Sequence, residues 1–142
     1  GVHTWAPVNI TYGHNNRSAQ FRLPQNRYCI ENRAADLTMN IYLALGMTIS
    51  AAVEGIKNKI EPGKPSDFDL YTLREEDMKK LGIRRLPKNL LQAVESLQNN
   101  KIAEKVLGKT MLNSYVNYKN DEWERYHQAV TDWEIKEYLR LY

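Results

Sequence analysis

Short alternating segments occupy the first part of this chain, and helical patterns occupy the rest. Residues 17–24 and 28–34 alternate apolar and polar side chains, which is typical of half-buried strands. The Pro-Gln-Asn step at residues 24–26 indicates a turn between them. We therefore predict a hairpin, or two strands of a larger sheet. Because a strand pair is marginal on its own, structure outside these 142 residues should cover it.

From about residue 40 the apolar positions repeat with helical spacing. Residues 40–59, with Asn40 as a suitable N-cap, are apolar on most sides, which predicts a helix enclosed by other structure. Thr131 and Glu134 have the spacing of a capping box and predict a last helix from there. Gly108 is a stop signal between two of the helices. Further helices are predicted over residues 74–81, 88–98, 101–107 and 109–129.

Composition narrows the classes of function. Of the 142 residues, 42% are hydrophobic and 26% are charged, as in an ordinary globular domain. The net charge of +3 is too small to indicate a nucleic-acid partner by itself. Residues 37–53 carry no charge but hold several polar side chains, so we predict a buried helix of a soluble protein and no membrane span. The single cysteine excludes an internal disulfide framework and fits a reducing compartment such as the cytoplasm.

The two predicted strands carry an unusual cluster of charges. Four arginines, Arg17, Arg22, Arg27 and Arg33, lie near one carboxylate, Glu31. Glu31 and Arg33 share a strand face, about 7 Å apart along the strand. Guanidinium groups bind phosphate oxygens, and a carboxylate beside them can hold a magnesium ion that bridges those oxygens. This pattern suits phosphoryl-transfer chemistry, but from composition alone a set of surface ion pairs on an edge strand is the favoured interpretation.

Other reactive side chains give weaker signals. His3, His14 and His127 are too scattered for a local metal motif, so structural or capping roles are predicted for them. Cys29 shares a strand face with Glu31, but no histidine or asparagine partner is marked, so we interpret it as a small buried side chain. The aromatic residues after position 115 are interleaved with acidic ones, which favours helix packing or a subunit interface over base stacking.

Four motifs follow one another through the first part of the chain. They are Asn16-Arg17-Ser18-Ala19, Arg22-Leu23-Pro24, Glu31-Asn32-Arg33 and Asn40-Ile41-Tyr42-Leu43. In this order and spacing the sequence resembles the glutamine synthetase catalytic domain. The similarity continues through residues 55–63 and 69–71 and ends in residues 122–134, so it covers essentially the whole chain. The helical half is most similar to the type III-like branch, which includes γ-glutamylalkylamide synthetases.

The resemblance implies an α+β fold, with two β-strands that belong to a larger glutamine synthetase-type catalytic barrel, followed by about five or six α-helices. Residues 1–142 would then be the C-terminal portion of the catalytic domain. Residues 1–36 would supply strands and loops of the active site, and residues 37–142 the helical part. The rest of the site would lie in a preceding N-terminal part of the same protein.

The resemblance also implies an ATP-dependent ligase. Such an enzyme phosphorylates the side-chain carboxylate of glutamate, and ammonia or a small amine then displaces the phosphate. Arg17 and Arg22 would bind the phosphates of ATP, Arg17 and Arg33 would be catalytic, and Glu31 would bind Mg²⁺ or Mn²⁺. The full-length protein would form a ring-shaped homo-oligomer in the cytoplasm, and this fragment alone would be inactive.

Several positions depart from the family pattern. Cys29 stands where the family often has an arginine, which Arg27 could replace from nearby. Trp5 stands where many bacterial members carry a flap glutamate that favours ammonium, which leaves an alkylamine acceptor open. These two departures also leave open a non-catalytic helical interaction module on the same scaffold. Tyr71 matches a position that some bacterial members adenylylate, but its context lacks the usual basic residue, and packing on the helices is the alternative.

Overall fold

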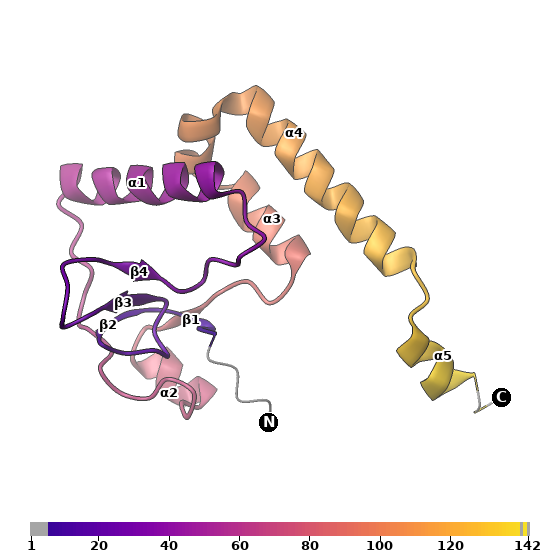
Figure 1. Ribbon diagram of the computed structural model, residues 1–142, viewed down its shortest axis with the longest axis horizontal. Coiled ribbons are helices and arrows are strands. Elements are labelled where there is room, and N and C mark those ends of the chain that lie inside the picture. The colour runs from indigo at the N-terminus through magenta and orange to yellow at the C-terminus, as the bar shows by residue number, and fades with distance from the viewer. Residues whose placement is uncertain (1–5, 140, 142) are drawn as a thin grey trace. The chain divides into compact units, whose positions relative to one another are not determined.

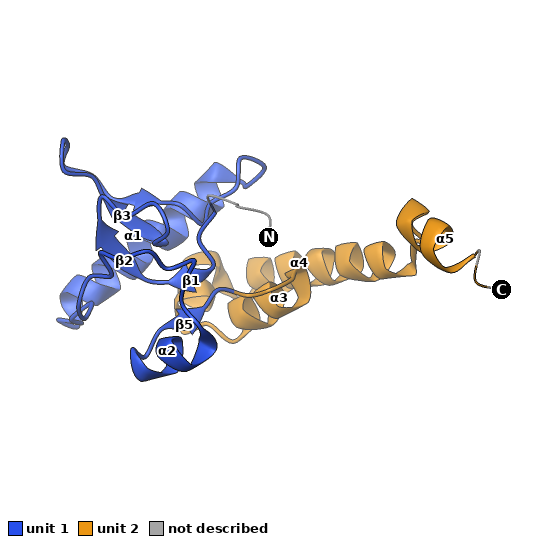
Figure 2. Cartoon of the chain, turned by 90° about the horizontal axis from the view of Figure 1, so that it is seen from below, with its two compact units in different colours: residues 1–86 blue, residues 87–142 orange. Residues whose placement is uncertain are grey.

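The computed structural model describes residues 6–139 and 141. The chain divides into two compact units, residues 1–86 and residues 87–142, which Figure 2 shows in different colours. Among the described residues, the first unit holds the strands and two helices, and the second holds three helices (Figure 1). This α+β organisation agrees with the fold class predicted from the sequence. The predictions that concern His3, Trp5 and Tyr142 fall outside the described residues.

Two small sheets build the first unit. β2 (Tyr12–His14) pairs in parallel with β3 (Phe21–Leu23), and β3 pairs antiparallel with β4 (Glu31–Asn32). β1 (Asn9–Ile10) pairs antiparallel with β5 (Arg84–Arg85). β3 and β4 confirm the two predicted strands, although both are shorter than the alternating pattern indicated. The other three strands have two or three residues each, which is too short for alternation to be visible in a sequence.

The first helix, α1 (Ile41–Lys57), begins where the sequence predicted it. The side chain of Asn40 accepts hydrogen bonds from the backbone nitrogens of Tyr42 and Leu43, at 3.1 and 3.2 Å. The described residues do not supply the predicted enclosure of this helix, because none of its residues is buried and Ile56 is 78% exposed. The described residues of the first unit place no layer of structure over its apolar faces.

The connection from α1 to the next helix carries part of the core. Leu70 in this segment is 2% exposed, and Met78 in the short helix α2 (Glu75–Lys80) is 5% exposed. Ala19, in the loop before β3, is fully buried. The buried side chains of the first unit thus come from the loop before β3, the connection after α1, and α2.

The second unit is helical. It consists of α3 (Leu90–Gln98), α4 (Lys101–Gln128) and α5 (Asp132–Tyr138). α3 packs against α4 and buries Val94, while α4 buries three residues of its own, Ala103, Leu112 and Val116. Among the described residues, no helix is both long and apolar enough to cross a membrane.

Helix ends in the second unit follow the predicted signals. Gly108 has φ 72° and ψ 155°, so α4 is interrupted at the predicted stop. Thr131 and Glu134 form the predicted capping box, in which the Thr131 hydroxyl accepts from the Glu134 backbone nitrogen. The Glu134 carboxylate in turn accepts from the Thr131 backbone nitrogen at 2.8 Å, and this bond lowers the pKa of the Glu134 carboxyl.

Candidate functional site

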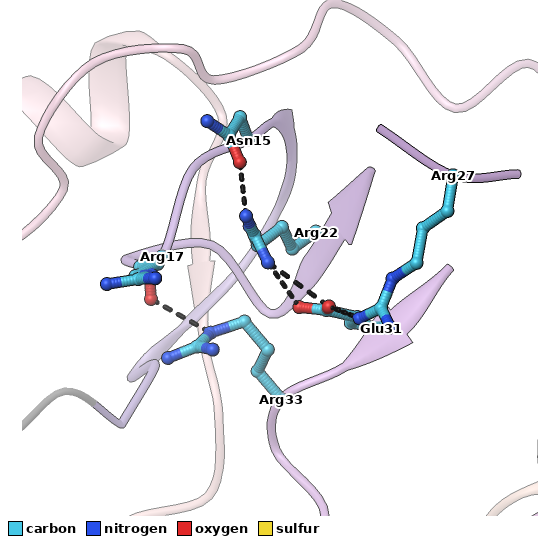
Figure 3. Close-up of polar contacts among 6 residues, drawn as sticks. All are labelled: Asn15, Arg17, Arg22, Arg27, Glu31 and Arg33. Atoms are coloured by element: carbon cyan, nitrogen blue, oxygen red, sulfur yellow. Dashed lines mark hydrogen bonds and ion pairs between the residues drawn. The ribbon is translucent and has the colours of Figure 1, made fainter. Parts of the chain in front are cut away.

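The register of β3 and β4 brings two of the predicted site residues together. Arg22 is the direct cross-strand partner of Glu31. Its Nη1 donates to both carboxylate oxygens of Glu31, at 3.1 Å to Oε1 and 2.9 Å to Oε2 (Figure 3). Only 16% of the Arg22 side chain and 23% of the Glu31 side chain are exposed. The carboxylate is therefore held from the neighbouring strand in a partly water-free setting.

Two further residues complete this charged cluster. Arg22 Nη2 donates to Asn15 Oδ1, and Arg27 Nη2 donates to Glu31 Oε1. The hydrogen bonds from Arg22 and then Arg27 lower the pKa of the Glu31 carboxyl. The hydrogen bond to Glu31 in turn raises the pKa of the Arg27 guanidinium. One donor of the cluster, the buried Nε of Arg22, has no hydrogen-bond partner among the described residues.

Arg17 and Arg33 form a second contact beside this cluster. Arg33 Nε donates to the backbone carbonyl oxygen of Arg17 at 3.0 Å. Figure 3 shows these two arginines on one side of the Arg22–Glu31 pair, with Arg27 on the other side. The guanidinium of Arg17 is exposed and has no hydrogen-bond or ion-pair partner within residues 6–139 or at 141. The positive charge of Arg17 thus points outward from its loop, and Arg33 holds the backbone of that loop.

The cluster suits an anion with several negative charges. Two guanidinium groups, of Arg22 and Arg27, bind the one carboxylate, and those of Arg17 and Arg33 lie to one side, so positive charge is in excess; guanidinium groups match the oxygens of phosphates. The fit for a divalent cation is poor by comparison. The described residues contain no group of three or more potential metal-ligating side chains. Glu31 is a single carboxylate whose oxygens already accept from arginines, so these residues do not by themselves form a metal site.

The described histidines have structural partners. His14 Nδ1 lies 3.0 Å from Asp67 Oδ2, and the backbone nitrogen of His14 donates to Asp67 Oδ1 at 2.6 Å. The ring of His127 packs on that of Trp123, with centroids 4.0 Å apart. Structural roles for His14 and His127 are therefore confirmed. None of these contacts lies in the arginine cluster.

Cys29 is exposed, so the prediction that it is a small buried side chain is wrong. The physical reason is that β4 begins only at Glu31, and Cys29 lies in the preceding turn, where its backbone nitrogen donates to the carbonyl of Arg27. Tyr71 is 42% exposed, and its hydroxyl donates to the carbonyl of Ala6 at 3.3 Å. No sequence pattern indicated a role for Asn15, whose side chain accepts from Arg22 across the loop.

Comparisons with known proteins identify the family of the chain. Residues 2–138 match the family described as glutamine synthetase, catalytic domain. The chain is 38% identical over 139 residues to a glutamine synthetase of Methanococcus maripaludis, covering 96% of this chain and 31% of the relative. It is 36% identical over 139 residues to a glutamate–methylamine ligase of Methyloversatilis universalis, covering 98% of this chain and 31% of the relative.

A solved structure gives the same result in three dimensions. The structure described as a complex of GmaS with ADP aligns with a TM-score of 0.83 and 32% sequence identity. The alignment covers 96% of this chain and 30% of that chain. The α+β chain therefore belongs to a family of ligases. That family is the glutamine synthetase family, and the match is to its catalytic domain. The chain spans 31% of the length of the relatives named above.

Proposed function

We propose that the complete protein is an ATP-dependent glutamate–ammonia ligase that forms glutamine through γ-glutamyl phosphate. The observation that carries this proposal is the Arg22–Glu31 pair, with Arg27 bound to the same carboxylate and Arg17 and Arg33 to one side. In the first step the terminal phosphoryl group of ATP moves to a side-chain oxygen of glutamate, and ADP leaves. In the second step the nitrogen of ammonia attacks the acyl carbon, the bond from that carbon to the phosphate oxygen breaks, and the nitrogen loses a proton.

The arginines have distinct proposed roles in these steps. Arg17 and Arg22 bind the phosphates of ATP, since phosphoryl transfer depends on neutralising and positioning phosphate oxygens. The outward guanidinium of Arg17 supports this role, because it is a donor without a partner in the described structure. Arg17 and Arg33 are the proposed catalytic residues. Arg33 stabilises the reacting carboxylate of the substrate.

We also propose that the complete protein uses Mg²⁺ or Mn²⁺ together with ATP, with Glu31 as one ligand. Such an ion supplies charge neutralisation for phosphate oxygens. The described residues offer one carboxylate for it, so the remaining ligands would have to come from the preceding N-terminal part of the protein. In this proposal residues 1–142 are the C-terminal portion of the catalytic domain, with the site strands in residues 1–36 and the helical part in residues 37–142.

Further parts of the proposal concern assembly and location. The complete protein would form a ring-shaped homo-oligomer, and residues 1–142 alone would be inactive because the arginine cluster offers one carboxylate. Measurable phosphate release that depends on ATP and glutamate, from purified residues 1–142, would contradict the inactive fragment. A reducing cytoplasmic location stays a prediction that rests on the single cysteine.

The experiment that tests the ligase measures phosphate release by the complete protein with glutamate, ATP and ammonia. Arg17→Ala and Glu31→Ala should each lower kcat/KM on the order of 10²-fold, because each removes charge that acts on the transferring group. Arg125→Ala is the matched control, since it removes an exposed ion pair with Asp121 in the other unit. Unchanged turnover after Glu31→Ala would refute the metal assignment. No turnover by the unsubstituted protein would favour a non-catalytic interaction module.

A second candidate function is that of a γ-glutamylalkylamide synthetase, which uses an amine in place of ammonia. It is supported by the 36% identity to a glutamate–methylamine ligase and by the similarity to GmaS. Initial rates of the complete protein with ammonia, methylamine and ethylamine decide between the two. A preference for ammonia of several hundredfold would exclude the amine function, since one extra or missing methylene changes discrimination by roughly 10–200-fold.

A further inference from the structure

The loop between β2 and β3 is tied to a segment that lies about fifty residues away in the sequence. The side-chain nitrogen of Asn16 donates to the carbonyl oxygen of Ser66 at 2.5 Å and to that of Phe68 at 2.8 Å. Its side-chain oxygen accepts from the backbone nitrogen and the hydroxyl of Ser18, at 2.9 and 2.7 Å. An asparagine amide offers two donors and two acceptor positions, and all four are used here.

A second hydrogen bond joins this loop to the same segment. The hydroxyl oxygen of Ser18 accepts from the backbone nitrogen of Leu70 at 3.1 Å. Ser18 is 5% exposed and Leu70 is 2% exposed, so water does not compete strongly for this hydrogen bond. Residues 66–70 therefore support the loop at both Asn16 and Ser18, the two residues that flank Arg17.

Contacts at the end of β2 hold residues 66–70 in place. The backbone nitrogen of Ser66 donates to the carbonyl of Tyr12 at 2.8 Å, and Asp67 accepts two hydrogen bonds from His14. Gly13 permits this close approach, because a Cβ atom there would lie 2.4 Å from the carbonyl oxygen of Ser66. The segment is thus fixed against the sheet along its length and forms a rigid support for the loop.

Arg17 depends on this support for its direction. The hydrogen bond from the Ser18 backbone nitrogen to the Asn16 side chain closes an Asx turn with Arg17 at its centre. Arg33 holds the carbonyl of Arg17 from the opposite side. The guanidinium of Arg17 has no partner among the described residues, so the direction of the side chain is set by the backbone of Arg17.

We propose that Asn16 is a positioning residue, which aims Arg17 at the phosphates of ATP by fastening the loop to residues 66–70. This inference rests on the function proposed above, in which Arg17 contacts those phosphates. Asn16 itself touches no reacting atom. Ser18 has the same role, through its hydrogen bond to Leu70.

The test is a double-mutant cycle in the complete protein, with Asn16→Asp and Arg17→Ala. Asn16→Asp keeps the acceptor that closes the turn but removes both donors to residues 66–70 and places a carboxylate against two carbonyl oxygens. We expect it to lower kcat/KM for ATP about tenfold or more, because small displacements of a positioned group are costly. In the Arg17→Ala background the same change should cost less than about twofold.

The matched control is Asn89→Ala, which removes a side-chain cap from α3 in the other unit. It should lower the melting temperature without changing kcat/KM for ATP. Equal losses from Asn16→Asp with and without Arg17 would overturn the inference while leaving the proposed function intact. An Arg17→Ala variant with unchanged ATP kinetics would instead contradict the proposed function.

If Asn16→Asp does not fold, Ser18→Ala completes the cycle, because it removes only the hydroxyl that joins the loop to Leu70 and Asn16. Its kcat/KM for ATP should fall about threefold or more, and only when Arg17 is present. A Ser18→Ala variant with wild-type ATP kinetics, or with a loss that persists without Arg17, would overturn the inference.

Discussion

Arg22 and Glu31 face each other across the antiparallel β3–β4 pair and are joined through a single guanidinium nitrogen that lies within 3.1 Å of both carboxylate oxygens. Because the pair is set by strand register, both charges stay in place without a ligand. The second guanidinium nitrogen of Arg22 binds Asn15, which fixes the plane of the group. This arrangement leaves the Nε of Arg22 as an unpaired buried donor within the described part of the chain.

The Arg22–Glu31 pair predicts a specific dependence of stability on pH. Hydrogen bonds from Arg22 and Arg27 hold the pKa of Glu31 below its usual value of 4.5. The stability that the carboxylate contributes is therefore complete above the pKa of the unfolded chain and is lost as the pH falls through the lower pKa of the folded state. Between pH 5 and pH 3, the melting temperature of the complete protein should fall further in the wild type than in Glu31→Gln.

The comparison with Glu31→Gln isolates this carboxylate, since all other titrating groups are shared by the two proteins. If the melting temperatures of the two proteins differ by the same amount at every pH between 3 and 7, the arginines do not stabilise the Glu31 carboxylate. Asp121→Asn is a useful control, because Asp121 forms an exposed pair with Arg125 and should give a smaller difference.

Arg22→Lys should impair activity although it keeps the charge. A lysine ammonium carries its three donors on one nitrogen, so it cannot reach Glu31 and Asn15 from the two separate positions that Nη1 and Nη2 of Arg22 occupy. We expect kcat/KM for ATP in the complete protein to fall about tenfold or more, in line with the loss of a charged hydrogen bond. Arg74→Lys, in an exposed pair with Asp77, is the control and should keep wild-type kinetics. Wild-type kinetics in Arg22→Lys would mean that only the charge matters.

The local elements of this fold could be predicted from the sequence because their signals lie within a few residues. The cap at Asn40, the interruption at Gly108 and the capping box at Thr131 all appear where their patterns indicate. The grouping of arginines around Glu31 was also visible as a local pattern. Its pairing was not, because alternation places Glu31 with Arg33, whereas β4 ends at Asn32 and Glu31 binds Arg22 across the sheet.

The supports of the site could not be predicted, since they join residues far apart in the sequence. Asn16 and Ser66 are fifty positions apart, and no periodicity relates a loop to a connector at that distance. For a related reason, the sequence predicted that α1 is covered without indicating the residues that cover it. An apolar pattern shows that a face can be covered but does not show which residues cover it.

Gly13→Ala should disrupt the support beneath Arg17. An added Cβ would lie 2.4 Å from the backbone carbonyl oxygen of Ser66 and 2.9 Å from the Cβ of Asn16, so the backbone must move. We expect a loss of stability of about 1–3 kcal/mol, typical of overpacking, together with a lower kcat/KM for ATP. Urea unfolding and ATP kinetics of the complete protein measure both effects. Retention of both properties would show that residues 66–70 can shift without affecting the site.

Gly108→Ala should destabilise the second unit, because its φ of 72° and ψ of 155° lie in a region that only glycine adopts readily. The expected cost is about 1–3 kcal/mol in urea unfolding of the complete protein. Gly55→Ala is the matched control, since Gly55 lies inside α1 with no other atoms within 4 Å of an added Cβ. That substitution should stabilise by up to about 1 kcal/mol, because alanine favours helix over glycine. Equal effects of the two substitutions on the free energy of unfolding would show that α4 can continue as a regular helix through residue 108. The interruption at Gly108 would then make no contribution to the packing of α3 on α4.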